Sequence, residues 1–169
     1  KLMQNMFRAD KNIGKDEELS KKIVILDENE MSHLLCGFPN LIGLGREIPA
    51  VYVSVLLQQD AVCPYIDVAQ EYVSIADDFP IFGACAIQCN TTCDGSMMGN
   101  GIMARRLEGE HGIPCFQLAA PMRHTEDGVQ EYAAQEIRNA IKFIEDCTGE
   151  KWDWDAYFEC AKRFNAETR

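Results

Sequence analysis

Short hydrophobic runs alternate along this chain with longer stretches in which apolar residues recur every three or four positions. The short runs predict buried strands over residues 22–26, 81–89 and 113–120. The longer stretches predict helices over residues 31–38, 64–75, 100–110, 127–148 and 153–164. Gly43 and Gly45 indicate a loop before the middle of the chain. This alternation, with short connections, predicts an α/β layer fold with a short parallel sheet and C-terminal helices.

The two C-terminal helices carry the clearest signals for where a helix begins and ends. Asp127 and Gln130 have the spacing of a capping box, and Gly149 supplies the left-handed residue that commonly follows a helix. Asp153 is expected to cap the last helix. The apolar face predicted for that helix consists of Trp154, Tyr157, Phe158, Ala161 and Phe164.

Length and composition are those of an ordinary globular domain. With 169 residues, 47% of them hydrophobic, the chain can bury one sizeable core. We expect a polar N-terminal arm over residues 1–20 and a single α/β domain over residues 21–169. Because the chain starts at Lys1 and stops directly after a helical pattern, we expect it to be one piece of a longer polypeptide.

Charge and cysteine usage narrow the classes of function. The net charge of −11 argues against nucleic-acid binding, which needs clustered Lys and Arg. No stretch approaches the ~18–20 apolar residues of a membrane span, and no signal-peptide pattern is present. Eight cysteines in such a chain indicate a reducing cytoplasm and argue against a disulfide framework.

Thiols gather where predicted strands meet loops and helices. Cys85, Cys89 and Cys93 lie four residues apart, and they lead from a buried strand into a turn that precedes a helix. Cys63 precedes Pro64, at the expected entrance of another helix. A helix N-terminus favours thiolate over thiol, and the carboxyl ends of parallel strands meet at one edge. The pattern therefore predicts a thiolate-ligated metal or cluster at that edge.

The cysteines differ in how well they suit ligation. Mid-strand Cys85 is expected to be a buried, structural residue, and the same interpretation is favoured for Cys89, whereas Cys93 is the better ligand. One alternative is a zinc or thiol binding module that uses Cys85, Cys89 and Cys93 without Cys63. Another is a plain α/β interaction domain with inert cysteines. Four further cysteines are expected to be inert on every hypothesis: Cys36, Cys115, Cys147 and Cys160.

Several motifs follow one another in order from residue 60 to the end of the chain. They are Asp60-x-x-Cys63-x-Tyr65, Asn90-Thr-Thr-Cys93-Asp94-Gly95, Gly112-Ile-Pro114-x-Phe116, Pro121, a Gln135 to Glu145 helix, Thr148-Gly149-Glu-Lys151, and an Asp155 to Asn165 helix. This ordered set resembles the 2-hydroxyacyl-CoA dehydratase/benzoyl-CoA reductase family. The resemblance implies a Rossmann-like domain, the first of three in a subunit.

The resemblance also implies a [4Fe–4S] cluster that is held by three cysteines and leaves one iron site open. Carried over by position, Cys63 and Cys93 are two of the three ligands, with Cys89 the alternative to Cys93. The third ligand is expected outside this chain. Candidates for a supporting shell around the cluster are Thr92, Asp94, Gly95, Ser96 and, on a later loop, His124.

The reaction implied is the elimination of water from a 2-hydroxyacyl-CoA, which begins when one electron is added to the thioester. A side-chain base alone cannot remove the unactivated β-proton, and the added electron makes that proton acidic. The implied partners are a related second subunit and an ATP-dependent iron–sulfur activator protein. Ring reduction of the benzoyl-CoA reductase type is the alternative within the family. The catalytic residues are not assigned, and the isolated chain is expected to be folded, inactive and metal-free when purified in air.

Overall fold

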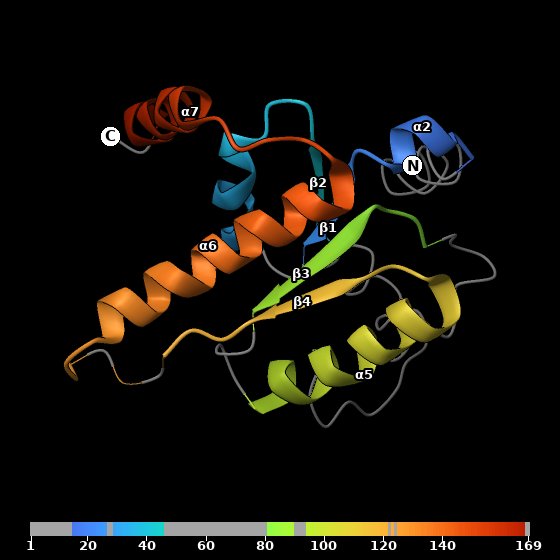
Figure 1. Ribbon diagram of the computed structural model, residues 1–169, viewed down its shortest axis with the longest axis horizontal. Coiled ribbons are helices and arrows are strands. Elements are labelled where there is room, and N and C mark those ends of the chain that lie inside the picture. The colour runs from blue at the N-terminus through green and yellow to red at the C-terminus, as the bar shows by residue number, and fades with distance from the viewer. Residues whose placement is uncertain are drawn as a thin grey trace.

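The computed structural model describes residues 15–26, 29–45, 81–89, 94–121, 123 and 125–167, and the structural statements below concern those residues. None of their helices is long and apolar enough to cross a membrane. Figure 1 labels the elements in chain order: α2 (Glu17–Ser20), β1 (Ile23–Leu26), the 3-10 helix η1 (Asn29–Gly37), β2 (Ile42–Gly45), β3 (Cys85–Cys89), α5 (Asp94–His111), β4 (Cys115–Leu118), α6 (Val129–Thr148) and α7 (Trp154–Glu167).

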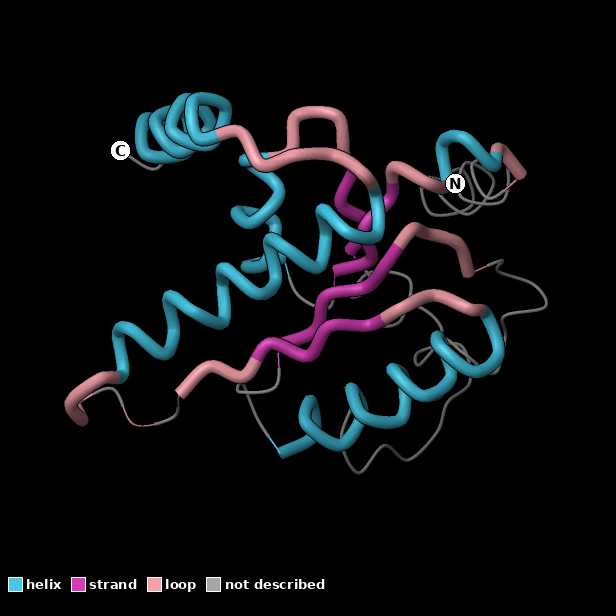
Figure 2. The backbone as a smooth tube through the Cα atoms, in the orientation of Figure 1, coloured by secondary structure: helices cyan, strands magenta, loops and turns pink. Residues whose placement is uncertain are grey.

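The four strands form one parallel sheet in the order β2-β1-β3-β4 (Figure 2). From β1 the chain passes through η1 to β2 at one edge, and from β3 it passes through α5 to β4 at the other. The strand order therefore reverses between β1 and β3. The prediction of an α/β fold with a parallel sheet and C-terminal helices is confirmed, because helices lie on both faces of the sheet (Figure 1).

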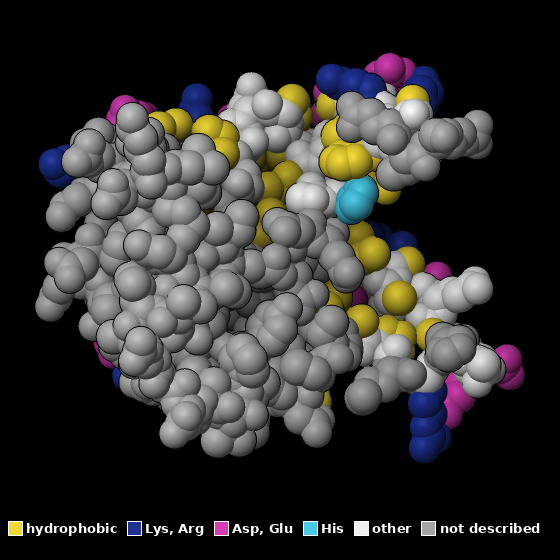
Figure 3. All heavy atoms as spheres, turned by 180° about the vertical axis from the view of Figure 1, so that it is seen from behind, with side chains coloured by type: hydrophobic (Ala, Val, Ile, Leu, Met, Phe, Trp, Pro, Cys, Tyr) yellow, Lys and Arg dark blue, Asp and Glu magenta, His cyan; other side chains and the backbone are white. Residues whose placement is uncertain are grey.

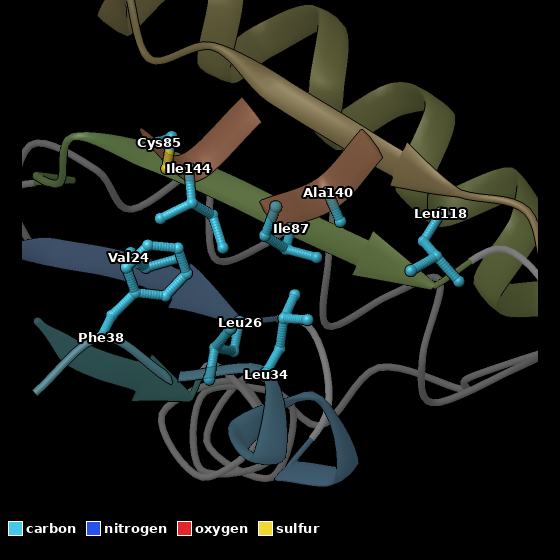
Figure 4. Close-up of a cluster of buried hydrophobic side chains, with 9 residues drawn as sticks. All are labelled: Val24, Leu26, Leu34, Phe38, Cys85, Ile87, Leu118, Ala140 and Ile144. Atoms are coloured by element: carbon cyan, nitrogen blue, oxygen red, sulfur yellow. The ribbon is translucent and has the colours of Figure 1, made fainter. Parts of the chain in front are cut away.

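Two hydrophobic clusters join the three layers. On one face, alternate strand residues such as Val24 and Ile87 pack with Phe38 beside η1 and with Ala140 and Ile144 of α6 (Figure 4). On the opposite face, the cluster consists of Ile25, Ala86, Met103, Leu107 and Ile113. Neighbouring residues of one strand point to opposite faces, so β1 and β3 are apolar on both sides. This explains why β1 is an unbroken hydrophobic run and why β3 is hydrophobic from Cys85 to Ile87.

The prediction of a loop at Gly43 and Gly45 is wrong, because these residues belong to β2. Strand β2 pairs with β1 in parallel, with Gly43 opposite Val24. A Cβ atom added at Gly43 would lie 2.8 Å from side-chain atoms of Leu26 and Leu35. Glycine is therefore used here to admit the packing of η1, and it does not mark a turn.

Two helix starts also differ from the predictions. Helix α6 begins after Gly128, whose φ of 84° is left-handed, and no side chain caps it. The proposed capping box of Asp127 and Gln130 is therefore wrong. Helix α5 begins at Asp94, six residues before the predicted start, although its glycines lower helix propensity.

The C-terminal caps agree with the sequence. Gly149 has a φ of 77° and donates its N–H to Glu145 O, which ends α6 as predicted. The Asp153 carboxylate accepts from the N–H groups of Asp155 and Ala156 at 2.8 and 3.1 Å and caps α7. Both helix ends could be predicted from the sequence, because each hydrogen bond joins residues that are at most four positions apart.

The expectation of inert Cys36 and Cys160 is wrong, because the two residues form a disulfide between η1 and α7. Their Cα atoms lie 5.6 Å apart, within the usual range for a disulfide. The two residues are 124 positions apart in sequence, so no local pattern could predict the disulfide. Helix α7 packs mainly against η1, and the disulfide fixes that contact.

Candidate functional site

The candidate site lies at the carboxyl edge of the sheet, where the strand order reverses between β1 and β3. Open α/β sheets place ligands in the crevice at such a point. Cys89 is the last residue of β3 and pairs with Leu118, the last residue of β4. Strand β1 ends beside them at Leu26, which pairs with Ile87. Cys89 is half-buried and lies on the side of the sheet that faces α6.

A buried amide holds the end of β3 in place from the opposite face. The Asn100 side chain, 4% exposed, donates a 2.9 Å hydrogen bond from Nδ2 to the carbonyl oxygen of Cys89. The backbone oxygen of Asn100 accepts from Gln117 Nε2 at 3.4 Å, which adds β4 to the same contact. The neighbouring Gln88 is fully buried as well. These polar groups fix the strand end relative to α5.

Sequence reasoning missed Asn100, because the predicted helix over residues 100–110 began at this residue and its side chain was given no role. In the structure it lies inside α5, with its side chain against the strand. Asn is a poor helix former. An Asn inside a helix that packs on a sheet therefore suggests that its side chain makes a specific hydrogen bond, and this was the available signal.

The start of α5 supplies the second feature of the edge. Helix α5 runs from Asp94 to His111, so the backbone of Asp94, Gly95 and Ser96 forms its first turn. The first N–H groups of an α-helix have no acceptor within the helix, and they form its positive end. They favour a thiolate or another anion beside them. Cys93 immediately precedes this turn in sequence.

Four of the eight predicted site residues lie outside the described residues. This holds for Cys63, Cys93, Thr92 and His124, so the structure places none of them. It does place Cys89 at the predicted edge, and it places the backbone of residues 94–96 in the first turn of α5, ahead of the start predicted for that helix.

Cys85 belongs to the core, as predicted for a structural cysteine. Its side chain is fully buried in the cluster beneath α6. Burial raises the pKa of this thiol far above its ordinary value, with a smaller contribution from the neighbouring Cys147. Burial also raises the pKa of Cys147. Both side chains are therefore held as neutral thiols, which are poor metal ligands.

Cys115 lies at the opposite end of the sheet from Cys89. It is the first residue of β4 and pairs with Ala86, one position after the start of β3. Its Sγ contacts the carbonyl oxygen of Ile113 at 3.8 Å. Cys115 therefore lies away from the candidate site, which agrees with the prediction that it is inert.

The described residues at the carboxyl edge supply only some of the ligands that a metal or iron–sulfur cluster would need. Cys89 and the first turn of α5 provide one thiol and a helix N-terminus at the right place. Within the described ranges, no three His, Cys, Asp or Glu side chains come together as a metal site would require. A cluster at this edge would therefore need ligands from beyond the described part of the chain.

Comparison with known protein families identifies a match to most of the chain. The family model described as 2-hydroxyglutaryl-CoA dehydratase, D-component, matches residues 46–169, which is most of the chain. The matched span includes Cys63, Cys89 and Cys93, together with the whole carboxyl edge at β3 and β4. A search of curated proteins returned no match.

Proposed function

Because the chain belongs to the 2-hydroxyglutaryl-CoA dehydratase D-component family, we propose that it is part of an iron–sulfur dehydratase subunit. The subunit would eliminate water from a 2-hydroxyacyl-CoA after transfer of one electron. The observation that carries the proposal, beside the family, is the placement of Cys89 and the start of α5 at the reversal point of the sheet.

We assign Cys63 and Cys93 as two of three cysteine ligands of a [4Fe–4S] cluster, with the third outside this chain. Cys93 is preferred because it directly precedes the positive end of α5, which lowers the pKa of a thiol. Cys89 is the alternative ligand, since it lies at the same edge. Cys85 takes no part, because its pKa is raised by burial in the core.

The residues of this chain would position the cluster and tune it. When bound, the cluster would supply electron transfer to the thioester and an iron that acts as a Lewis acid. The backbone N–H groups of residues 94–96 are suited to donate to cluster sulfur, which stabilises negative charge there. The Thr92 and Ser96 hydroxyls and His124 are the candidates for further hydrogen bonds. Asn100 would hold the strand end from which the ligand loop departs.

The partners follow from the reaction class. A D-component is by its description one component of a larger dehydratase. We propose a related second subunit, an ATP-dependent iron–sulfur activator protein that delivers the electron, and an acyl-CoA substrate. A cytoplasmic location suits cysteines that must stay reduced to bind iron, and the Cys36–Cys160 disulfide would be an exception to the thiol state usual there.

The test is anaerobic iron–sulfur reconstitution of the whole subunit with its partner subunit. Cys63→Ala and Cys93→Ala are each expected to lose about four irons and the visible absorption of the cluster. Cys115→Ala is the matched control, since Cys115 lies at the far end of the sheet, and it is expected to keep its iron.

Three results would contradict parts of this assignment. Full iron in both variants would overturn the cluster proposal. Loss of iron in Cys89→Ala but not in Cys93→Ala would assign the ligand to Cys89, four residues before Cys93. Zinc held by Cys85, Cys89 and Cys93 together, without Cys63, would favour the zinc module.

A further inference from the structure

Helix α7 lies outside the hydrophobic core of the domain. No described residue of α7 belongs to either hydrophobic cluster, whereas α6 contributes Ala140 and Ile144 to one of them. Two large apolar side chains of α7, Trp154 and Phe158, are instead 59% and 55% exposed. A helix of this length is only marginally stable in water without apolar packing. The position of α7 therefore depends on its contacts with η1, against which it mainly packs.

Two strong contacts fix α7 on η1. At the start of the helix, the Asp153 N–H donates to Gly37 O at 2.9 Å. About two helical turns further on, Cys160 forms the disulfide with Cys36 of η1. A helix that is held at two points cannot pivot, whereas a helix held at one point can. Opening the disulfide would therefore let α7 turn about Asp153.

Aromatic contacts add to these two points without replacing the disulfide. Tyr157 packs on Trp152 near the start of the helix, with 5.3 Å between the ring centroids. Past the disulfide, Phe164 lies beside His33 of η1, with 4.7 Å between the centroids. Phe164 is still 39% exposed, and such a ring pair is much weaker than a covalent bond. The disulfide therefore decides whether the second half of α7 stays on η1.

The 3-10 helix η1 is the fixed member of this pair. Leu34 of η1 and Phe38, which directly follows it, are buried in the cluster beneath α6. Loss of the disulfide leaves these core contacts intact. We therefore expect α7 to move and η1 to stay in place.

Both sulfur atoms belong to residues near the surface. Cys36 and Cys160 are each half-buried, unlike Cys85, which is fully buried in the core. Thiol–disulfide exchange begins when a thiolate attacks one sulfur of a disulfide, so it needs access to that sulfur. Exposed disulfides are accordingly more often labile and regulatory than buried ones.

The closed disulfide also completes an apolar cavity of about 280 Å³ between η1, α6 and α7. Leu34 of η1 and Ile141 of α6 line two of its sides, and Trp154 and Tyr157 line the side formed by α7. Figure 3 shows hydrophobic side chains around a deep indentation in the outline, with a histidine on its rim. Movement of α7 would remove one wall of the cavity. The state of the disulfide therefore controls the shape of this surface.

We propose that Cys36 and Cys160 form a reversible redox switch, which pins α7 on η1 when it is oxidised and releases α7 when it is reduced. The structure shows the oxidised state. Disulfides in a reducing cytoplasm are usually transient, catalytic or redox-sensing. That cytoplasmic location rests on the proposed function, whereas the contacts that make α7 depend on the disulfide do not.

A low-molecular-weight thiol of the glutathione class opens the switch. Its thiolate attacks one sulfur of the disulfide and forms a mixed disulfide, and the other cysteine leaves as a thiolate that takes up a proton. A second thiol molecule then attacks the mixed disulfide and leaves with the first as their oxidised disulfide. Two thiol molecules thus supply the two electrons and two protons that Cys36 and Cys160 gain. An excess of the oxidised disulfide drives the same steps in reverse.

The first measurement is the state of the two cysteines in the folded chain. The 169-residue chain is equilibrated without denaturant in buffers that differ in their ratio of reduced to oxidised glutathione. Iodoacetamide labelling and peptide mass spectrometry then give the fraction of Cys36 and Cys160 present as thiols. We expect full opening with reduced glutathione in large excess and full closure with oxidised glutathione in large excess. Cys85 should stay unlabelled in both buffers, because the core stays folded.

The second measurement is amide hydrogen exchange in the two end states. Amides of α7 should exchange at least about tenfold faster in the reduced state, and those of Ala140 and Ile144 in α6 should not change. Cys160→Ser should behave like the reduced chain in both buffers. Cys115→Ser is the matched control, because it removes a half-buried thiol at the far end of the sheet. It should keep the wild-type response.

Each part of the proposal has a result that overturns it. A disulfide that resists glutathione as long as the chain is folded would be a structural bond and no switch. Unchanged exchange in α7 after reduction would show that the disulfide does not hold the helix. Faster exchange throughout α6, with labelling of Cys85, would mean that reduction unfolds the whole domain. Failure of oxidised glutathione to restore protection in α7 would exclude reversibility. None of these measurements needs a cluster, so the iron reconstitution remains a separate test of the proposed function.

Discussion

The side-chain amide of Asn100 donates a 2.9 Å hydrogen bond to the backbone carbonyl of Cys89, and it does so from a position that is 4% exposed. This contact ties α5 to the end of β3, directly before the loop that carries the proposed ligand. It makes the geometry of the carboxyl edge depend on one buried polar side chain.

Asn100→Ala should therefore destabilise the fold, because it leaves the carbonyl oxygen of the half-buried Cys89 without this donor. We expect a loss of about 1–3 kcal/mol in the free energy of unfolding, measured by urea denaturation. Asn139→Ala is the matched control, since Asn139 makes exposed hydrogen bonds on α6. It should change the free energy by less than about 0.5 kcal/mol. Equal effects of the two variants would contradict the role given to Asn100.

The disulfide between Cys36 and Cys160 should make stability sensitive to reductant. It closes a separation of 124 residues, for which chain-entropy arguments allow up to about 4–5 kcal/mol. We expect a reductant to lower the unfolding midpoint of the wild-type chain and to leave that of Cys160→Ser unchanged. Thiol titration of the unfolded, unreduced chain should find two fewer thiols than after reduction. A full count of eight thiols without reductant would refute the pairing.

Cys85 should resist alkylation as long as the chain is folded. Its thiol is fully buried, and burial raises its pKa, so little thiolate is present and no reagent reaches it. Iodoacetamide labelling followed by peptide mass spectrometry should leave Cys85 unmodified in the native chain at pH 8. The residue should become labelled after unfolding in urea. Rapid native labelling would show that the core at β3 opens readily.

Glu145 should give the fold a measurable dependence on acid. The backbone N–H of Trp152 donates to Glu145 at 3.0 Å and, with a smaller contribution from Lys151, lowers the pKa of the carboxyl. A carboxyl with a lowered pKa stabilises the fold above its ordinary pKa of about 4.3, and that contribution is lost as pH falls through the lower folded value. Glu145→Gln should thus be less stable than wild type at pH 7, and the difference should shrink below about pH 4.

Thermal unfolding of the two proteins from pH 7 to pH 3 measures this difference. Lys151→Ala is the informative control, because it removes only the smaller contribution and should keep most of the pH dependence. A stability difference that stays constant over this range would show that the bond from Trp152 does not perturb Glu145.

Much of the fold could be predicted from local sequence. The hydrophobic runs of β1 and of Cys85 to Ile87 in β3 follow from burial on both faces, and the helix ends marked by Gly149 and Asp153 depend on contacts within four residues. The family was also identified at this level, because its motifs keep a fixed order along the chain, and the match to residues 46–169 confirms it.

Contacts between distant residues were decided by the tertiary structure. Gly43 became part of a strand because β1 offers a parallel partner and Leu35 occupies the space where a side chain would lie. The face of α7 that carries Trp154 was predicted to be apolar, and the packing of α7 against η1 leaves this ring largely exposed. The sequence by itself determined the periodicity, the family, the end of α6 at Gly149 and the Asp153 cap of α7, since these depend on the order and chemistry of nearby residues. Only the tertiary structure decided the Cys36–Cys160 disulfide, the hydrogen bond from Asn100 to Cys89, and the grouping of Trp152, Trp154 and Tyr157 beside η1 and α6. Each of these joins segments that are distant in sequence, and no local pattern predicts that they meet.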